Sequence, residues 1–188
     1  MTDARTDEEI AQAVQAGESE LFGVLIDRFA PKLRRYGQRF LSMQEDVEDV
    51  VQDAFIKAYQ NIRRYDPKQP FSPWMYRIAH NTFVNALRAK ARRPVLVFDF
   101  DTLVSFSMAQ EEADEGAKRR EMRELIERGL GALSPKYREV LILYYLEEQS
   151  YQDIADILQV PVGTVGVRLR RAKEALLRAY ADSGIDAI

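Results

Sequence analysis

Residues 73–93 concentrate side chains that can bind nucleic acid. This segment holds five Lys and Arg and no Asp or Glu, although the chain of 188 residues has a formal net charge of −3. With helical spacing its polar side chains line one face: Trp74, Arg77, Asn81, Asn85, Arg88 and Arg92. Guanidinium groups bind phosphates, amides pair with base edges, and an indole stacks on an unpaired base. The pattern predicts a nucleic-acid-binding face that Arg93 extends. The alternative is a solvated basic helix whose tryptophan packs in the core.

A second basic segment lies near the C-terminal end. Residues 161–173 hold four Arg and Lys and no acid, and they follow a short amphipathic stretch at 151–158 and the tight turn QVPVG. Small Ala155 lets two helices cross closely, which is typical of a helix-turn-helix whose second helix enters the major groove. A plain helical hairpin is the alternative. The candidate DNA-binding residues are Thr164, Gly166, Val167, Arg168, Arg170, Arg171 and Lys173.

Acidic segments alternate with these basic ones. Residues 45–53 hold five acids and residues 94–117 hold six, with no base in either. Charge segregated in this way favours oppositely charged partners at different places, although solvated helix faces are the simpler reading. Carboxylates on one helix with no His nearby suit a protein partner better than a divalent metal. We therefore expect no metal site and no cofactor.

Helices must position these groups, because apolar residues recur at helical spacing through nearly all of the chain. The pattern breaks at residues 63–74 (RRYDPKQPFSPW), where three prolines predict a loop. It breaks again between 94 and 118, which we interpret as a linker. The expected fold is all-α, with two small helical domains, 1–94 and 119–183, joined by a flexible acidic linker, 95–118.

Several classes of protein are not favoured by the composition. There is no cysteine, so no disulfide, thiolate zinc site or cysteine nucleophile is available. No apolar run approaches the roughly 18 residues of a transmembrane helix, and the acidic N-terminus is unlike a signal peptide, so we expect a cytoplasmic protein without membrane insertion. With one His, no phosphate-cradling glycine loop and no acid–base pair, catalysis is not expected.

Three motifs resemble one bacterial family. The stretches EDVEDVVQDAFIKAYQNIRRYD, FSPWMYRIAHNTFVNALRAKARR and LSPKYREVLILYYLEEQSYQDIADILQVPVGTV occur in this order. Together they are similar to the extracytoplasmic-function sigma factors, over about residues 10–180. The resemblance implies sigma region 2 in residues 1–94, and region 4 in residues 119–183. It implies a stress-responsive transcription factor that binds core RNA polymerase and recognises −10 and −35 promoter elements.

The resemblance also implies roles for individual residues. The polymerase β′ clamp helices would contact a docking face made by Asp46, Glu48, Asp49, Gln52, Asp53 and Phe55. The basic face from Trp74 to Arg93 would recognise and open the −10 element, and the loop at residues 66–73 would capture a flipped base. The helix-turn-helix would read the −35 duplex, the C-terminal domain would contact the β flap, and an anti-sigma factor would hold the protein inactive.

One departure from the family pattern concerns the −35 reader. Members of the family usually carry a basic and then a small polar residue after GTV, where this chain has Gly166 and Val167. Glycine costs about 1 kcal/mol in a helix interior and removes a base contact. The alternatives are a closer approach of the backbone to DNA and readout shifted to Arg170 and Arg171, so the family's usual −35 preference is not assigned to this chain. The functional alternative is a helix-turn-helix regulator that binds operators without polymerase, which would not need the acidic docking face.

Overall fold

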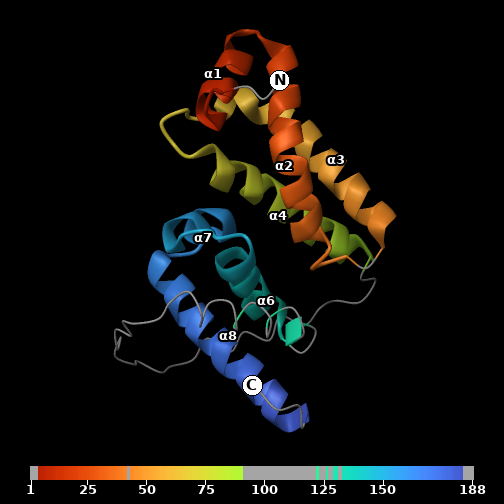
Figure 1. The fold of residues 1–188 in the computed structure, drawn as a ribbon, viewed down its shortest axis with the longest axis vertical. Coiled ribbons are helices and arrows are strands. Elements are labelled where there is room, and N and C mark those ends of the chain that lie inside the picture. Colours follow the sequence, from red (N-terminus) through yellow and green to blue (C-terminus); the bar gives the residue numbers. More distant parts are fainter. Residues whose placement is uncertain are drawn as a thin grey trace.

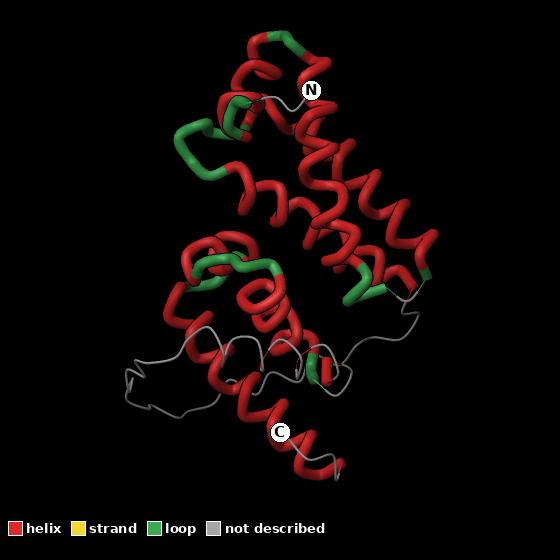
Figure 2. The backbone as a smooth tube through the Cα atoms, viewed as in Figure 1, coloured by secondary structure: helices red, strands yellow, loops and turns green. Residues whose placement is uncertain are grey.

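The computed structural model describes residues 4–41, 43–90 and 133–183, together with Met122, Ile126, Gly129 and Leu130. All regular elements in this part of the chain are helices, which confirms the all-α prediction (Figure 2). Helices α1 to α4 form an N-terminal body, and α6 to α8 form a C-terminal body (Figure 1). The predicted linker, 95–118, lies outside the described residues.

The N-terminal body consists of four helices and two short 3-10 turns. Their bounds are α1 Asp7–Ala16, η1 Ser19–Leu21, α2 Phe22–Gly37, α3 Gln44–Asn61, η2 Ile62–Arg64 and α4 Phe71–Lys90. A capping box starts α1, because Thr6 Oγ1 accepts a hydrogen bond from the Glu9 amide and the Glu9 carboxylate accepts one from the Thr6 amide. Gly17 ends α1 with a φ of 115°, a conformation that glycine adopts without steric cost.

The core of the N-terminal body lies where α3 and α4 pack together and α2 crosses them. Phe29, Tyr36, Met75 and Phe83 are all fully buried there. Gly37 allows the closest approach, because a Cβ at this position would lie 2.3 Å from Cζ of Phe83. The amphipathic pattern of each helix thus places the polar face of α4 away from this core.

The start of α4 differs from the prediction. The loop expected over residues 63–74 ends earlier, since α4 begins at Phe71. Pro73 lies in the first helical turn, where its missing N–H has no intrahelical partner to lose. The Glu8 carboxylate of α1 accepts a hydrogen bond from the Phe71 amide at 2.8 Å. This tertiary contact caps the N-terminus of α4. No local sequence pattern predicted it.

Among the described residues, the C-terminal body comprises a helix-turn-helix and the helical segment that precedes it. Its bounds are α6 Pro135–Leu141, the π-helical turn η4 Ile142–Leu146, α7 Tyr151–Leu158 and α8 Val162–Ser183. Helix α8 packs against α6 and α7, and its residues Val165, Leu169 and Leu176 are buried. A capping box between Ser150 and Asp153 starts α7. Gln159 ends it in the left-handed conformation, which turns the chain into α8.

The two bodies contact each other through α4 and α7. The Tyr76 hydroxyl of α4 donates a hydrogen bond to Glu147 Oε2 at 2.6 Å, and Arg35 Nη2 of α2 lies 3.8 Å from the same oxygen. The Glu147 side chain is only 3% exposed. The Glu147 carboxylate of the C-terminal body is therefore buried against α4 and α2 of the N-terminal body.

Candidate nucleic-acid interface and docking groove

The polar side chains that were predicted to share one face of α4 are exposed or half-buried in the structure. Asn81, Asn85 and Arg88 are exposed, and Arg77 is half-buried. Within the described residues of α4 there is no acidic side chain, so this face offers only amide and cationic groups. Arg92 and Arg93 lie outside the described residues. The chemistry of the remaining face suits phosphates and base edges.

Trp74 lies at the N-terminal end of this face and is neither free nor fully buried. Its ring centroid is 5.2 Å from that of Tyr65 and 5.4 Å from that of Phe71. The indole therefore packs on an aromatic cluster but is not fully buried. Such a half-packed ring is already oriented, which lowers the entropic cost of stacking on a base.

Hydrogen bonds from α1 hold the start of the loop that precedes α4. Gln15 of α1 donates hydrogen bonds to the carbonyl oxygens of Ile62 and Tyr65, each at 2.7 Å. The Tyr65 hydroxyl donates to the Gln69 carbonyl, and the Lys68 amide donates to Asp66 at 3.0 Å. Burial and the nearby carboxylate of Glu8 raise the pKa of Tyr65, so this hydroxyl stays a donor. Hydrogen bonds to α1 and within the loop therefore hold it beside the polar face.

A groove between α2 and α3 contains part of the predicted docking face. Its lining includes Glu48, Asp49, Gln52 and Phe55 from the predicted set, whereas Asp46 and Asp53 lie on the same helix outside the lining. Phe55 is only 7% exposed and packs edge-to-face on Phe22, so it forms the floor of the groove. Among the described residues, no group of His, Asp or Glu could hold a metal ion.

Several groove residues were missed by sequence reasoning. Ile56 is 48% exposed on α3, and Ile26 of α2 is also exposed at the opposite wall. Arg34 of α2 reaches across and places Nε 2.8 Å from both carboxylate oxygens of Glu48. The sequence could have indicated Ile56 as an apolar residue within an acidic helix. That Ile26 lies on the opposite wall follows only from the packing of α2 against α3.

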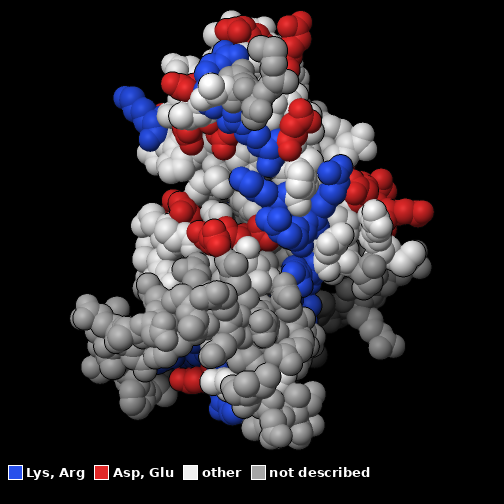
Figure 3. Space-filling model, in the orientation of Figure 1, with Lys and Arg blue, Asp and Glu red and all other residues white. Residues whose placement is uncertain are grey.

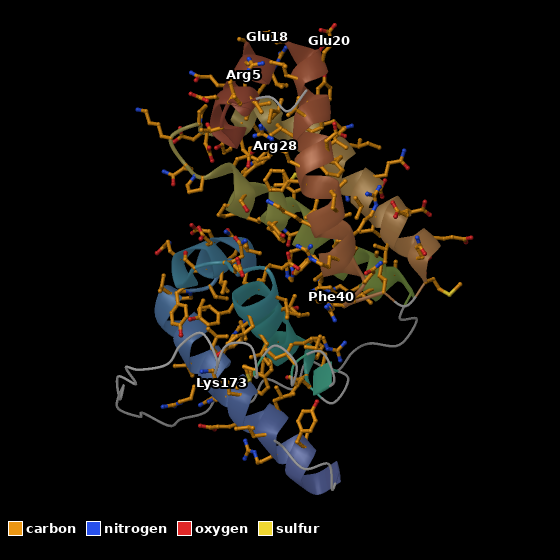
Figure 4. The ribbon with its side chains drawn as sticks, viewed as in Figure 1. Arg5, Glu18, Glu20, Arg28, Phe40 and Lys173 are labelled. Atoms are coloured by element: carbon orange, nitrogen blue, oxygen red, sulfur yellow. The ribbon has the colours of Figure 1, made fainter. Side chains whose placement is uncertain are left out.

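A basic segment that begins in α2 and ends just after it was also missed by sequence reasoning. Residues 28–39 hold five Lys and Arg and no acid. Figure 3 shows Lys and Arg gathered in a band over the N-terminal body, reaching toward the C-terminal one. Several of these cations have internal roles: Arg28 bonds Asp7 at 2.6 Å, Arg34 bonds Glu48, and Arg35 lies near Glu147. Figure 4 shows Arg28 on α2.

The recognition helix of the helix-turn-helix is α8. Val167 is exposed, and Thr164, Gly166, Arg168, Arg170 and Arg171 are half-buried. A hollow beside the first turns of α8 is lined by Lys136, Tyr137, Gly163, Thr164, Val167, Arg168 and Arg171. Lys136 comes from α6 and was not predicted. The hollow combines a small apolar surface with three cations.

Lys173 differs from the other predicted residues of α8 (Figure 4). Its ammonium lies 5.6 Å from the centroid of the Tyr145 ring. Burial disfavours the charged form, but the hydrogen bond with Tyr145 and the nearby tyrosines outweigh burial, so the pKa of Lys173 is raised. This side chain is therefore a positive charge held against the aromatic surface of η4.

Titratable groups gather where the two bodies meet. The Tyr36 hydroxyl and His80 Nδ1 are 2.9 Å apart, and burial together with Arg88 lowers the pKa of His80 to about 4. Burial raises the pKa of Glu139 to about 7, and Arg168, Arg88 and Arg138 limit the rise. His80 is thus neutral at pH 7, and Glu139 keeps its proton to a higher pH than an exposed carboxyl does.

Two family models match the chain. The model described as Sigma-70 region 2 matches residues 25–93, and the model described as Sigma-70, region 4 matches residues 123–176. The first therefore covers α3, α4 and most of α2, and the second covers the helix-turn-helix.

Curated relatives and solved structures agree with these matches. The ECF RNA polymerase sigma factor SigW of Bacillus subtilis (strain 168) is 34% identical over 177 residues, 90% of this chain and 94% of SigW. The ECF RNA polymerase sigma-E factor of Escherichia coli (strain K12) is 34% identical over 182 residues, 94% of this chain and 95% of that protein.

Two solved complexes resemble the fold. One is CnrH with the cytosolic domain of CnrY, with a TM-score of 0.69, 28% identity, and coverage of 94% of this chain and 97% of that chain. The other is the sigma factor RpoE with the anti-sigma factor NepR from Bartonella quintana, with a TM-score of 0.58, 26% identity, and coverage of 84% and 94%.

Proposed function

Because this chain belongs to the extracytoplasmic-function (ECF) RNA polymerase sigma factors, we propose that it binds core RNA polymerase and directs transcription from promoters with −10 and −35 elements. The proposal rests on three surfaces found in one chain. They are an apolar groove with acidic residues at its rim, the basic polar face of α4 and the basic hollow beside α8.

The groove between α2 and α3 is the proposed dock for the β′ clamp helices of the polymerase. Ile26 and Ile56 offer apolar contacts that a partner can bury, and Asp49 adds negative charge at the rim. A basic helical partner with apolar side chains along its seam complements this surface. Asp46 and Asp53 extend the negative field along α3 and favour encounter with such a partner.

The polar face of α4 is the proposed −10 reader. Asn81 and Asn85 supply amides for base edges, and Arg77 and Arg88 bind the phosphates on either side. Trp74 stacks on a base displaced from the duplex, beside the hydrogen-bonded loop at residues 66–70. The cationic residues Arg92 and Arg93 extend the phosphate contacts.

Helix α8 is the proposed −35 reader, acting on duplex DNA. Lys136, Arg168 and Arg171 around the hollow bind phosphates, and the exposed turn that carries Val167 approaches the base edges. In this arrangement residues 1–94 and 119–183 act as two DNA-reading domains joined by the predicted linker, 95–118.

The remaining parts of the proposal concern partners and location. RpoE in the solved complex is bound by an anti-sigma factor, and we extend such regulation to this chain. Contact of the C-terminal domain with the β flap completes the polymerase interface. The protein works where the polymerase is, in the cytoplasm, and contributes no catalytic step of its own. No helix in the described residues has the length and apolarity to cross a membrane.

The experiment is co-elution with core RNA polymerase from a sizing column. The test variant carries Asp49→Lys and Asp53→Lys, which reverse two exposed charges of α3. We expect polymerase affinity to fall about 10- to 100-fold, because like charges then face each other in the interface. The control variant carries Glu18→Lys and Glu20→Lys, an equal change of charge in the turn between α1 and α2 (Figure 4).

The outcomes separate the two candidate functions. Co-elution of the natural chain and the control, with loss in the test variant, supports the sigma factor. A folded natural chain that binds duplex DNA but never co-elutes with polymerase refutes it and favours the operator-binding regulator. Equal affinity of both variants for polymerase would contradict the placement of the dock on α3.

A further inference from the structure

The exposed turn of the recognition helix has an unusual composition. Val162 and Val167 are 39% and 42% exposed at the start of α8, and Gly163 and Gly166 lie between them. Positions three and four apart are neighbours on a helix surface, so these four residues form one continuous patch. A helix that reads DNA thus presents an apolar and nearly side-chain-free surface where polar readers are expected.

Packing inside the protein does not account for the two glycines. A Cβ at Gly163 would meet nothing within 4 Å, and at Gly166 it would meet Tyr151 Cε2 at 3.6 Å, an ordinary van der Waals distance. Neither residue needs the positive φ for which glycine is favoured. Glycine still lowers helix stability at Gly166, in the interior of α8. Neither internal packing nor backbone conformation explains this composition, which suits a surface that another molecule approaches closely.

The charges around the patch indicate what approaches it. Lys136, Arg168 and Arg171 line the same hollow as Gly163 and Val167. Three cations beside an apolar patch are complementary to the phosphates that flank a DNA groove, and they are unsuited to an apolar protein partner. The position of the patch on the second helix of a helix-turn-helix points to the major groove.

One apolar group is displayed on base edges in the major groove, the C5 methyl group of thymine. We infer that this chain reads thymine methyl groups of its −35 element through Val167, with the glycines letting the helix backbone approach the bases. The inference rests on the proposed function and specifies what its −35 site recognises. The inference predicts T·A pairs at the base positions that face Gly166 and Val167. Relatives that carry a basic residue after GTV would recognise these base positions through groups other than the thymine methyl.

The test uses the full chain assembled with core RNA polymerase. A duplex library randomised over the −35 region is passed over the assembled complex, and the bound sequences are determined. Duplexes with the enriched sequence are then made with uracil in place of single thymines, which removes only the methyl group. We expect binding to fall about fourfold for each contacted methyl group, the factor that burial of one such group provides.

Two variants locate the contact. Val167→Ser is expected to abolish the effect of uracil at one position, and Gly166→Lys is expected to shift the enriched sequence toward guanine. Leu177→Ser changes an equally exposed residue of α8 that does not line the hollow, and it should leave the sequence unchanged. The uracil measurement uses the natural chain, so it does not depend on how any variant folds.

The possible results are distinct. An enriched sequence without thymine, or one that tolerates uracil at every position, would overturn the inference while the sigma-factor proposal survives. A chain that fails to bind polymerase and enriches no duplex would overturn both.

Discussion

The hydrogen bond between Tyr76 and Glu147 makes the contact between the two bodies testable. The Glu147 carboxylate is almost completely buried, and the Tyr76 hydroxyl is its hydrogen-bond donor at 2.6 Å. Tyr76→Phe removes this donor and keeps the ring that packs edge-to-face on Tyr36 at 5.6 Å. Arg35 Nη2 then remains near the carboxylate, at 3.8 Å, but its side chain is half-exposed.

The magnitude follows from the charge and burial of the acceptor. Hydrogen bonds to charged groups contribute about 1.5–3 kcal/mol, and a buried carboxylate that loses its donor is penalised by a similar amount. We expect the closed arrangement of the two bodies to be weakened by this amount in the variant. At 1.4 kcal/mol for each factor of ten, the closing equilibrium falls about 10- to 100-fold.

Energy transfer between two dyes measures this equilibrium. The chain has no cysteine, so Lys68→Cys and Gln152→Cys introduce unique labelling sites, one on each body. Both residues are exposed. Transfer efficiency is followed against urea for the natural chain, for Tyr76→Phe and for Tyr59→Phe, a control whose ring packs on Phe22 within the N-terminal body.

The refuting result is clear. If Tyr76→Phe gives the same transfer efficiency at every urea concentration as the natural chain, the buried hydrogen bond does not hold the bodies together. A fall of the same size in the Tyr59→Phe control would also contradict the reasoning, because that variant leaves the contact between the bodies unchanged.

Further predictions concern stability. Gly166→Ala should raise the free energy of unfolding by about 0.5–1 kcal/mol in urea titration, because alanine favours the helix and its Cβ fits 3.6 Å from Tyr151. Gly37→Ala should do the opposite, since its Cβ would clash with Phe83, and a stable Gly37→Ala protein would contradict this packing. Glu139 has its pKa raised to about 7 by burial, so the folded state holds the proton more tightly than the unfolded state. The contribution of Glu139 to stability is therefore complete at low pH and declines as pH rises from about 5 to 7. Glu139→Gln should flatten the dependence of the free energy of unfolding on pH over this range. An unchanged slope in the variant would show that Glu139 does not cause the decline.

Much of the secondary structure could be predicted because its signals are local. Apolar spacing indicated the helices, and the start of α6 carries residues typical of that position, Ser134 as the N-cap and Pro135 as the first helical residue. The turn of the helix-turn-helix could be predicted from QVPVG and from small Ala155, which is buried. The absence of acid from α4 likewise needed only a reading of consecutive residues.

The limits of local reasoning are visible in the N-terminal body. Three prolines predicted a loop up to residue 74, but a carboxylate from α1 caps α4 at Phe71. Phe55 belongs to the predicted docking face, but its place on the groove floor depends on its packing against Phe22 of α2. Both features arise from contacts between residues more than thirty positions apart.

The sequence by itself determined which helices form, which of their faces are basic or acidic, and that α8 follows a helix-turn-helix turn. These properties depend on periodicity and charge within a single segment, and a single segment contains them completely. Only the tertiary structure decided that Ile26 and Ile56 share one groove, that Lys173 lies against Tyr145, and that Tyr76 meets Glu147, 71 residues further along the chain. Each of these pairings depends on how helices pack, and packing is set by the shape of the whole core rather than by the pattern of any one helix.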